Sequence, residues 1–358
     1  MSSHAIEVIT IPKVKKHPNA DTLGLVDIWG WSCCIRLNDF KEGDLAVYIP
    51  PDYMVPDIEA FQFLKDSSSD RWRRIRVRRF RGILSQGLVW FAPEGTKEGD
   101  DVMELMGITR YEPPLPTSFN TDNETGPHGY YPKYDVENYR RYGSGIFVEG
   151  EEIVVTEKIH GCNARFVCTL PKSDKTWPDG TPIGPCDAAF PNESETLRMF
   201  CGSRTNWKKK DEKSPWWQTL QQNPAIETWC RAHPGLVLYA EVYGQVQSLK
   251  YGANRNQFFV AVFDILDLDG NWLEFDEAFT LVSEVPGLNW APVVYRGLCN
   301  EEVLELAEGD SLIPGANHLR EGVVVQPIKE RRDNMCGRVK LKIVSNQYLE
   351  GKKSHRGA

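Results

Sequence analysis

The chain has 358 residues, a length that favours two domains. Hydrophobic residues make up 41% and charged residues 26%, which excludes a largely disordered or fibrous chain. The formal net charge is −8, so the whole chain is not a general polyanion binder, although a local basic patch can still bind nucleic acid. No apolar run approaches the roughly 18 to 20 residues that span a membrane. We expect no secretory signal, and nine cysteines without a C-x-x-C pair favour an intracellular protein with reduced thiols.

The N-terminal part alternates apolar and polar residues in short runs between Gly and Asp turns. These runs predict strands at Ala5–Val14, Leu23–Arg36, Asp44–Ile49 and Gly87–Phe91. Short strands with little helical periodicity are typical of a small β-barrel or sandwich.

A basic run follows within this part, because residues 71–81 hold seven arginines in eleven positions. A strand over 74–78 would place two apolar residues on one side and three arginines on the other. These three are Arg74, Arg76 and Arg78. We favour contact with RNA phosphates, and the alternative is pairing with acidic neighbours such as Asp66 and Asp70.

Residues 113–145 differ in composition, since they are rich in Pro, Gly, Asn and Tyr. Low-complexity linkers rarely carry five tyrosines, so we interpret 113–149 as a connector with packed aromatic side chains. The predicted domains are therefore 1–112 and 150–358, on either side of this connector.

The second region mixes strands and helices. Glu152–Glu157 and Ala164–Thr169 look like strands paired around a turn, and 171–197, with five prolines, looks like a long surface loop. Further strands are predicted at Leu236–Val242, Phe258–Ile265, Gly322–Pro327 and Gly337–Val344, and helical segments at Thr219–Ala232 and Glu301–Glu308. The expected fold class is α+β with a β-rich first domain.

Charged side chains interrupt several apolar strands of this region. Lys158 ends one such strand, Glu241 and Glu321 lie in two others, and Lys340 and Lys342 share a strand face. Buried carboxylates favour a metal or hydroxyl partner, and adjacent ammonium groups favour an anion between them. Taken singly, each lysine could instead be solvated at a strand edge.

In this order, the motifs resemble those of the covalent nucleotidyltransferases, which include nucleic-acid ligases and mRNA capping enzymes. The K-x-x-G motif is Lys158 to Gly161. The sequence Glu-Lys-Ile-His-Gly-x-Asn resembles the RNA ligase 2 type, as do the later pieces Ser203-Arg204, Phe263-Asp264-Ile265 and Ser345-Asn346. Residues 11–50 and 81–88 resemble the OB-like N-terminal domain of the deinococcal type of RNA ligase.

The resemblance implies a β-rich OB-like domain followed by a two-sheet covalent nucleotidyltransferase domain. The implied activity is an ATP-dependent RNA ligase that seals 3′-OH/5′-phosphate nicks or ends through lysyl-AMP and RNA-adenylate intermediates. Lys158 would be the nucleophile, and Glu321 and Glu241 would hold Mg²⁺, which Mn²⁺ can replace. The residues implied to contact the nucleotide are Glu157, Ile159, His160, Gly161, Asn163, Arg204, Glu241, Phe263, Glu321, Lys340 and Lys342.

Several roles follow from the same resemblance. Phe263 would stack on adenine, and Lys340 and Lys342 would hold the α-phosphate. Asn163 would help to place the RNA 5′-phosphate, and His160 would act near the pyrophosphate. We expect the partner to be RNA or a nicked duplex that contains RNA, and the protein to be a monomer.

Two other classes of function remain open at this point. One is a DNA ligase or a capping guanylyltransferase, but the R-P-x-R-type tail of capping enzymes is not apparent. The other is a binding module that senses RNA ends without sealing them. The presence of all five charged residues of the motifs argues against the second class.

Overall fold

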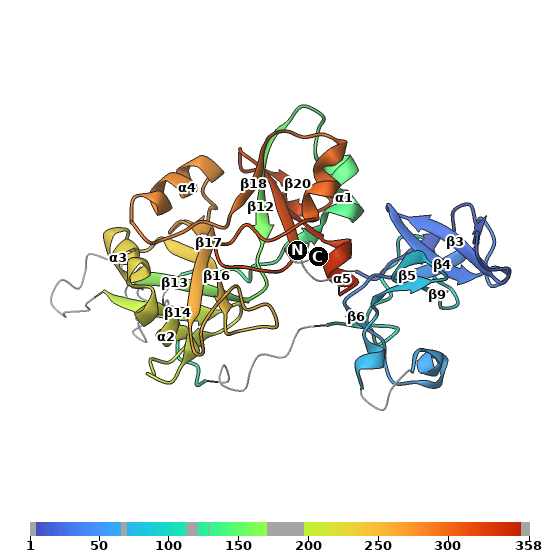
Figure 1. The fold of residues 1–358 in the computed structure, drawn as a ribbon, viewed down its shortest axis with the longest axis horizontal. Helices are drawn as coiled ribbons and strands as arrows, with labels where there is room; N and C mark the ends of the chain where they lie inside the picture. Colours follow the sequence, from blue (N-terminus) through green and yellow to red (C-terminus); the bar gives the residue numbers. More distant parts are fainter. Residues whose placement is uncertain (1–4, 66–69, 112–120, 128, 170–196, 352–358) are drawn as a thin grey trace, which may run out of the picture. The chain divides into compact units, whose positions relative to one another are not determined.

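The computed structural model describes residues 5–65, 70–111, 121–127, 129–169 and 197–351, which fall into two compact units (Figure 1). The first unit contains Met1–Pro114, Glu137–Gly145 and Asn346–Lys352. The second contains Leu115–Val136, Ile146–Ser345 and Lys353–Ala358. The predicted connector contributes residues to both units, and the predicted loop at 171–197 lies outside the described residues except for Leu197.

The first unit is built from short antiparallel strands. One sheet has the order β1-β5-β9 and contains β1 (Val8–Thr10), β5 (Leu45–Ile49) and β9 (Leu88–Phe91). A second has the order β2-β3-β4 and contains β2 (Lys15–Lys16), β3 (Leu23–Ile28) and β4 (Trp31–Arg36). Contacts of β4 with β9 and with β8 (Ile83–Gln86) join them around one core.

The predicted strand Leu23–Arg36 is a hairpin of β3 and β4. Its two-residue turn, Trp29 and Gly30, has φ angles of 52° and 76°, the left-handed values that tight hairpin turns require. Along β4, Trp31, Cys33 and Ile35 are buried while the intervening side chains are more exposed. This alternation builds one wall of the core.

The remaining elements of the first unit are short. They are β6 (Tyr53–Met54), the 3₁₀ helices η1 (Glu59–Leu64) and η2 (Asp70–Arg73), β7 (Val77–Phe80), β10 (Thr109–Arg110), β11 (Glu137–Asn138) and α5 (Asn346–Leu349). Helix α1 (Tyr139–Ile146) lies in this unit up to Gly145, and its last residue, Ile146, belongs to the second unit.

The arginine run does not form the single strand expected at 74–78, because β7 begins only at Val77 and pairs with β8. The side chains still alternate, since Ile75 and Val77 are buried while Arg76 and Arg78 are exposed. The local pattern therefore identified the two faces correctly but not the strand boundary.

Arg74 does not share the exposed row. Its Nε donates to Asp52 Oδ1 at 2.9 Å, and its guanidinium lies 3.8 Å from the centre of the Tyr111 ring. Asp52 is therefore an acidic partner of this arginine. Asp66 and the Asp70 side chain, which the sequence suggested as partners, lie outside the described residues.

The second unit contains two larger antiparallel sheets. The first has its strands in the order β22-β19-β12-β18, namely β22 (Leu341–Val344), β19 (Gly322–Pro327), β12 (Glu152–Lys158) and β18 (Val293–Leu298). The other has the order β15-β14-β13-β16-β17, namely β15 (Trp207–Lys208), β14 (Arg198–Ser203), β13 (Cys162–Thr169), β16 (Val237–Gly244) and β17 (Phe258–Leu266).

The expected pairing of β12 with β13 is wrong. β12 pairs with β18 and β19, whereas β13 pairs with β14 and β16. Ile153, Val154 and Val155 are fully buried, as expected for an interior strand with neighbours on both edges. The chain therefore crosses from one sheet to the other at residues 159–161, directly after Lys158.

Helices cover the second sheet (Figure 1). α2 (Pro215–Gln222) contacts β14 and β17, α3 (Pro224–Ala232) contacts β13, and α4 (Phe275–Ser283) contacts β17. The predicted helix Thr219–Ala232 is divided because Pro224 cannot continue the hydrogen-bond ladder. The helical segment expected at Glu301–Glu308 is the 3₁₀ helix η4 (Glu301–Ala307).

The predicted strand Gly337–Val344 is also divided. β21 (Gly337–Arg338) pairs with β20 (Arg332–Asp333), and β22 starts at Leu341. Lys340 consequently precedes the strand that contains Lys342. In the described part of the chain, no helix is both long and apolar enough to cross a membrane.

Candidate active site

Lys158 is the last residue of β12 and lies opposite Gly322 of β19. Because Glu321 directly precedes β19, this strand pairing brings the two side chains together. Lys158 Nζ lies 2.6 Å from Glu321 Oε1, and both side chains are largely shielded from solvent. The pair joins two of the predicted site residues.

His160 lies beside the same carboxylate. Its Nδ1 is 3.5 Å from Glu321 Oε2, and its Nε2 is 3.1 Å from Ser248 Oγ. The His160 backbone N–H donates to Tyr251 Oη at 2.7 Å. These contacts fix the segment that crosses between the sheets.

Gly161 is required for close approach at this crossing. A Cβ atom at this position would lie 2.2 Å from the Val242 carbonyl oxygen of β16. At Gly322, a Cβ would lie 2.0 Å from the Ile343 carbonyl oxygen. Neither position accepts a side chain without displacement of the backbone.

Glu241 lies on β16, opposite Asn163 of β13. Burial raises the pKa of its carboxyl group to about 8, although the charge of Lys158 acts in the opposite direction. Burial would raise the pKa of Glu321 too, but Lys158 and His160 lower it to about 2. The two carboxyl groups therefore differ in protonation at neutral pH.

Two buried oxygen atoms of the site make no close hydrogen bond to the described residues, namely Asn163 Oδ1 and Glu321 Oε2, and the second of these has His160 Nδ1 at 3.5 Å. Such oxygens are the ligands that Mg²⁺ and Mn²⁺ prefer. The described residues contain no group of three or more His, Cys, Asp or Glu side chains arranged for a metal. A metal here would therefore need further oxygens from a phosphate or water, which is usual for Mg²⁺ at phosphate sites.

An apolar cluster adjoins the charged residues. Ile159 is buried in it with Tyr251 and Ala261, and Phe263 packs against the cluster from β17. Ile159 directly follows Lys158 in the chain, so the backbone of the lysine is joined to this apolar cluster. Such a surface suits a flat, weakly polar ring.

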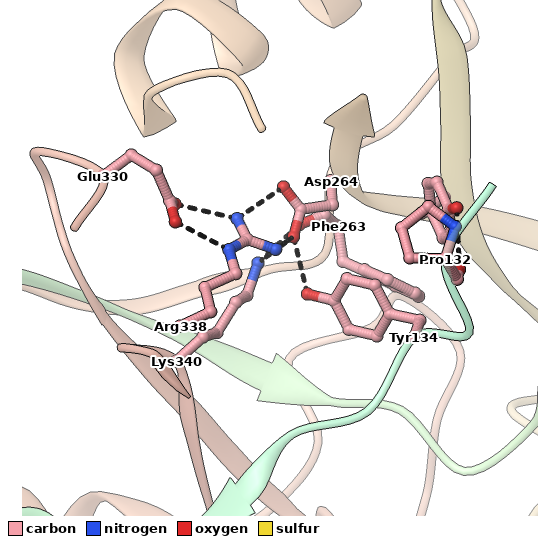
Figure 2. A network of polar contacts seen from close by, with 8 residues as sticks. Pro132, Tyr134, Phe263, Asp264, Glu330, Arg338 and Lys340 are labelled. Atoms are coloured by element: carbon pink, nitrogen blue, oxygen red, sulfur yellow. Dashed lines mark hydrogen bonds and ion pairs between the residues drawn. The ribbon is translucent and has the colours of Figure 1, made fainter. Parts of the chain in front are cut away.

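Lys340 belongs to a second polar network, which Figure 2 shows. Its Nζ donates to Asp264 Oδ2 at 2.8 Å and to the Phe263 carbonyl oxygen at 2.9 Å. Tyr134 Oη donates to the same Asp264 oxygen at 2.6 Å. Lys340 and Lys342 were expected to require an anion between them. For Lys340, that anion is the carboxylate of Asp264.

Arg338 completes this network (Figure 2). Its guanidinium donates to both oxygens of Asp264, at 2.5 and 3.0 Å, and to both oxygens of Glu330, at 2.8 and 2.9 Å. Burial would raise the pKa of Asp264, but Arg338 and Lys340 lower it to about 2. Burial lowers the pKa of Lys340 to about 8, against the effect of Asp264.

Arg204 follows β14 and is held by the same chain segment that supplies Tyr134. Its Nη2 lies 2.6 Å from Asp135 Oδ2, and its Nε donates to the Tyr134 carbonyl oxygen at 3.1 Å. Lys342, in contrast, is half-buried on β22, opposite Val324.

The Glu157 side chain forms hydrogen bonds with a loop that contains Ser311 and Leu312. Glu157 is 2% exposed, and its carboxylate accepts hydrogen bonds from Ser311 Oγ at 2.6 Å and from the Leu312 N–H at 2.7 Å. Burial raises the pKa of this carboxyl group, while the two hydrogen bonds oppose that effect. The side chain therefore anchors a loop beside β12.

Four side chains of this network had no predicted role, namely Tyr134, Asp264, Glu330 and Arg338. Asp264 is a carboxylate within an apolar strand, the same signal that singled out Glu241. Tyr134 carries no comparable signal, because only the tertiary path of the connector brings it to β17.

Two family models match the chain. One is described as RNA ligase and matches residues 151–344, more than half of the chain, and another is described as an OB-fold domain and matches residues 5–92. The chain belongs to the RNA ligase family. It is a polynucleotide ligase that acts on RNA, and its first β-rich region is an OB-fold domain.

Solved structures of a Naegleria gruberi RNA ligase share the fold of this ligase. An arginine-to-alanine variant with ATP and Mn has a TM-score of 0.76 and 24% identity, over 98% of this chain and 99% of that chain. The structure with pyrophosphate has a TM-score of 0.75 and 25% identity, over 99% of both chains. A lysine-to-methionine variant with AMP and Mn has a TM-score of 0.73 and 24% identity, over 97% of this chain and 98% of that one. A search of curated proteins finds no match.

Proposed function

We propose that this ligase uses ATP and joins RNA ends through an AMP group carried on Lys158. The ion pair between Lys158 and Glu321 is the observation that carries this proposal. It places an amine at the end of a buried strand and next to a carboxylate. The ATP, AMP and pyrophosphate bound by the similar Naegleria structures support the choice of nucleotide.

Lys158 acts as the nucleophile toward the α-phosphorus of ATP, with pyrophosphate as the leaving group. The amine must first lose its proton and leave its ion pair with Glu321. The AMP then passes to the 5′-phosphate of RNA. The 3′-hydroxyl of the other end displaces AMP and forms the phosphodiester bond.

Glu321 and Glu241 are the residues that would hold a divalent cation, with Asn163 Oδ1 as a further buried oxygen ligand nearby. When bound, Mg²⁺ or Mn²⁺ neutralises phosphate charge and favours attack on phosphorus. Cation binding at Glu241 would also favour ionisation of a carboxyl group whose pKa burial has raised.

The apolar cluster would receive the adenine, with Phe263 as the stacking side chain and Ile159 beside it. Glu157 would act indirectly, through the loop that its carboxylate anchors. Gly161 would allow the crossing segment to approach the phosphates closely.

Lys340 and Lys342 would hold the α-phosphate. For Lys340 this requires exchange of the Asp264 carboxylate for phosphate. Arg204 would contact the nucleotide, and Asn163 the RNA 5′-phosphate. His160 would act near the pyrophosphate, since it lies beside Glu321.

The substrate would be a nicked duplex or a pair of RNA ends with 3′-OH and 5′-phosphate groups. Arg76 and Arg78 of the OB-fold domain would contact the RNA, whereas Arg74 is engaged by Asp52. A monomeric, intracellular protein with domains at 1–112 and 150–358 remains our prediction.

Incubation of the full chain with α-labelled ATP or GTP and Mg²⁺, followed by a denaturing gel, tests this function. The proposal requires label from ATP on the protein and its release as AMP when nicked RNA is added. Label from GTP alone would indicate capping chemistry, and no label from either nucleotide would indicate a protein that binds RNA ends without sealing them.

A further inference from the structure

The first unit contains an aromatic pocket, which we define by its rim residues Phe63, Phe80 and Phe91 and its wall residue Trp90. Its volume is about 490 Å³. This lies within the range of roughly 300–1,000 Å³ that is usual for small-molecule sites. All of its lining residues lie between Leu23 and Phe91, so the pocket belongs to the OB-fold domain alone.

The rim side chains are unusually exposed for their type. Phe63 is 53%, Phe80 is 41% and Phe91 is 51% exposed. Phe63 stacks on Trp90 with ring centres 5.1 Å apart and planes inclined by 10°, and Phe91 packs on the buried Phe40 at 4.9 Å. The Phe63 and Phe91 rings are thus held in place, and all three rings still present surface to solvent.

Cationic side chains line the same pocket. Arg76 and Arg78 are exposed and contribute to its lining, together with Arg36 of β4. Asp39 is the acidic residue of the lining. Flat apolar surfaces and guanidinium groups therefore occur together around one cavity.

We propose that the aromatic pocket binds unpaired nucleotides of the RNA substrate, with bases stacked on the phenylalanines and phosphates held by the arginines. This inference deepens the proposed function and depends on it for the identity of the substrate. A base in a duplex is already stacked between its neighbours, so exposed rings have access only to unpaired bases. A surface that contacted only the duplex backbone would need the arginines but not the aromatic rim.

The proposal assigns the OB-fold domain a preference for single-stranded RNA. A nick with a short unpaired segment would consequently bind more tightly than a flush nick. The chief alternative occupant is an apolar segment of another protein, for which the aromatic rim would suffice without the arginines.

Fluorescence anisotropy of the full chain with a single-stranded RNA of about 12 nucleotides tests this proposal, because OB-fold sites cover roughly 4 to 16 nucleotides. A second RNA has the same backbone but abasic central positions. The proposal predicts that the wild-type protein binds the intact RNA at least about tenfold more tightly than the abasic one, as expected from stacking of one or more bases. Equal affinity for the two RNAs would overturn it without the use of any variant.

The double variant Phe80→Leu/Phe91→Leu removes the flat rings but keeps apolar side chains. It should lose about tenfold in affinity for the intact RNA and bind the abasic RNA as the wild type does. The matched control is Phe279→Leu on α4, which is 38% exposed and lies in the other unit. The single variant Phe80→Leu provides the same comparison if the double variant is unstable.

Two results would contradict the proposal, namely unchanged binding of the intact RNA by the variants or an equal loss for both RNAs. Unchanged binding would favour a protein segment as the occupant. Self-adenylylation should be normal in every variant. Absence of self-adenylylation in the wild type would refute the proposed function. It would not bear on the aromatic pocket, because RNA affinity is measured without ATP.

Discussion

The two glutamates nearest to Lys158 have opposite electrostatic environments. Glu321 contacts Lys158 and His160, and these neighbours lower its pKa to about 2 against the effect of burial. Glu241 has no comparably short ion pair among the described residues, and burial raises its pKa to about 8. The site therefore holds one permanent carboxylate and one carboxyl group that ionises near neutral pH.

The substitution Glu241→Gln should change how stability depends on pH. Because the folded-state pKa of Glu241 is above its ordinary value of 4.5, the folded wild type holds this proton more tightly than the unfolded chain does. Its stability should fall as pH rises from about 4.5 to about 8, and the glutamine variant should lack this component. Relative to the wild type, the variant should gain on the order of 2 kcal/mol or more between pH 5 and pH 8.5.

Urea unfolding of both proteins at the two pH values measures this difference. A difference in free energy of unfolding that does not vary with pH would show that Glu241 titrates normally.

Asp264 should have the opposite dependence on pH. Its folded-state pKa of about 2 is below the ordinary value of 3.8, so its stabilising contribution is present above about pH 4 and is lost as pH falls toward 2. Asp264→Asn leaves Arg338 and Lys340 close together without their shared anion, and should cost about 3–5 kcal/mol at pH 7. The advantage of the wild type should shrink at pH 3.

Tyr134→Phe is the matched control for this prediction. It removes one hydrogen bond to the same Asp264 oxygen and leaves both ion pairs in place, so it should cost about 1.5–3 kcal/mol. Comparable losses in the two variants would contradict a dominant role for the ion pairs.

The crossing at residues 159–161 explains why the K-x-x-G motif lies where residues from both sheets of the second unit meet. β12 ends at Lys158 in one sheet and β13 begins at Cys162 in the other, so three residues connect two sheets. The pairings of β12 with β19 and of β13 with β16 bring Glu321 and Glu241 to this crossing. The spacing of the motif is therefore a consequence of the sheet arrangement.

Gly161→Ala should impair self-adenylylation without unfolding the protein. The new Cβ would lie 2.2 Å from the Val242 carbonyl oxygen, so the crossing segment must move. A displacement on the order of 1 Å at a reacting group costs on the order of 100-fold in rate. The rate of AMP transfer to the protein, measured with labelled ATP, checks this expectation.

Gly145→Ala in α1 is the matched control, because a Cβ there would meet no atom within 4 Å. This variant should retain the wild-type rate. A normal rate in Gly161→Ala as well would mean that β16 yields to the added methyl group.

Local patterns predicted some of these elements and failed for others. The apolar strands β16 and β17 follow directly from their runs of apolar residues. The single strand expected over Leu23–Arg36 is instead the β3–β4 hairpin. The pairing of β12 with β13 was predicted wrongly because local sequence does not show which distant strands pair with β12. In the structure these strands are β18 and β19. Pro224 was a visible helix breaker, and its effect on the segment 219–232 could have been predicted.

In the whole molecule, the residues proposed for nucleotide transfer and those proposed for RNA binding lie in different compact units. The residues proposed for nucleotide transfer lie in the second unit, whereas Arg76, Arg78 and the aromatic pocket lie in the first. The order of five short motifs grouped Lys158, His160 and Glu321, and the structure brings these three side chains together. The Asp264 network could be predicted only in part, since Tyr134 reaches it through a connector whose path is set by tertiary packing.

Arg76→Gln/Arg78→Gln should weaken RNA binding and leave self-adenylylation unchanged. Each lost phosphate contact on a single strand should reduce the slope of log affinity against log salt by about 0.7. Titrations of RNA at several salt concentrations measure this slope. Arg296→Gln, an exposed arginine paired with Asp276 in the other unit, is the control. An unchanged slope in the double variant would exclude RNA contact by these arginines.

In the proposed reaction, Lys158 carries AMP between ATP and RNA. The most direct measurement is mass spectrometry of peptides from the full chain after reaction with ATP and Mg²⁺ without RNA. We predict an added AMP on the peptide that contains Lys158, its disappearance when nicked RNA is supplied, and loss of both adenylylation and sealing in Lys158→Ala. AMP on another residue, or undiminished sealing by Lys158→Ala, would contradict the account.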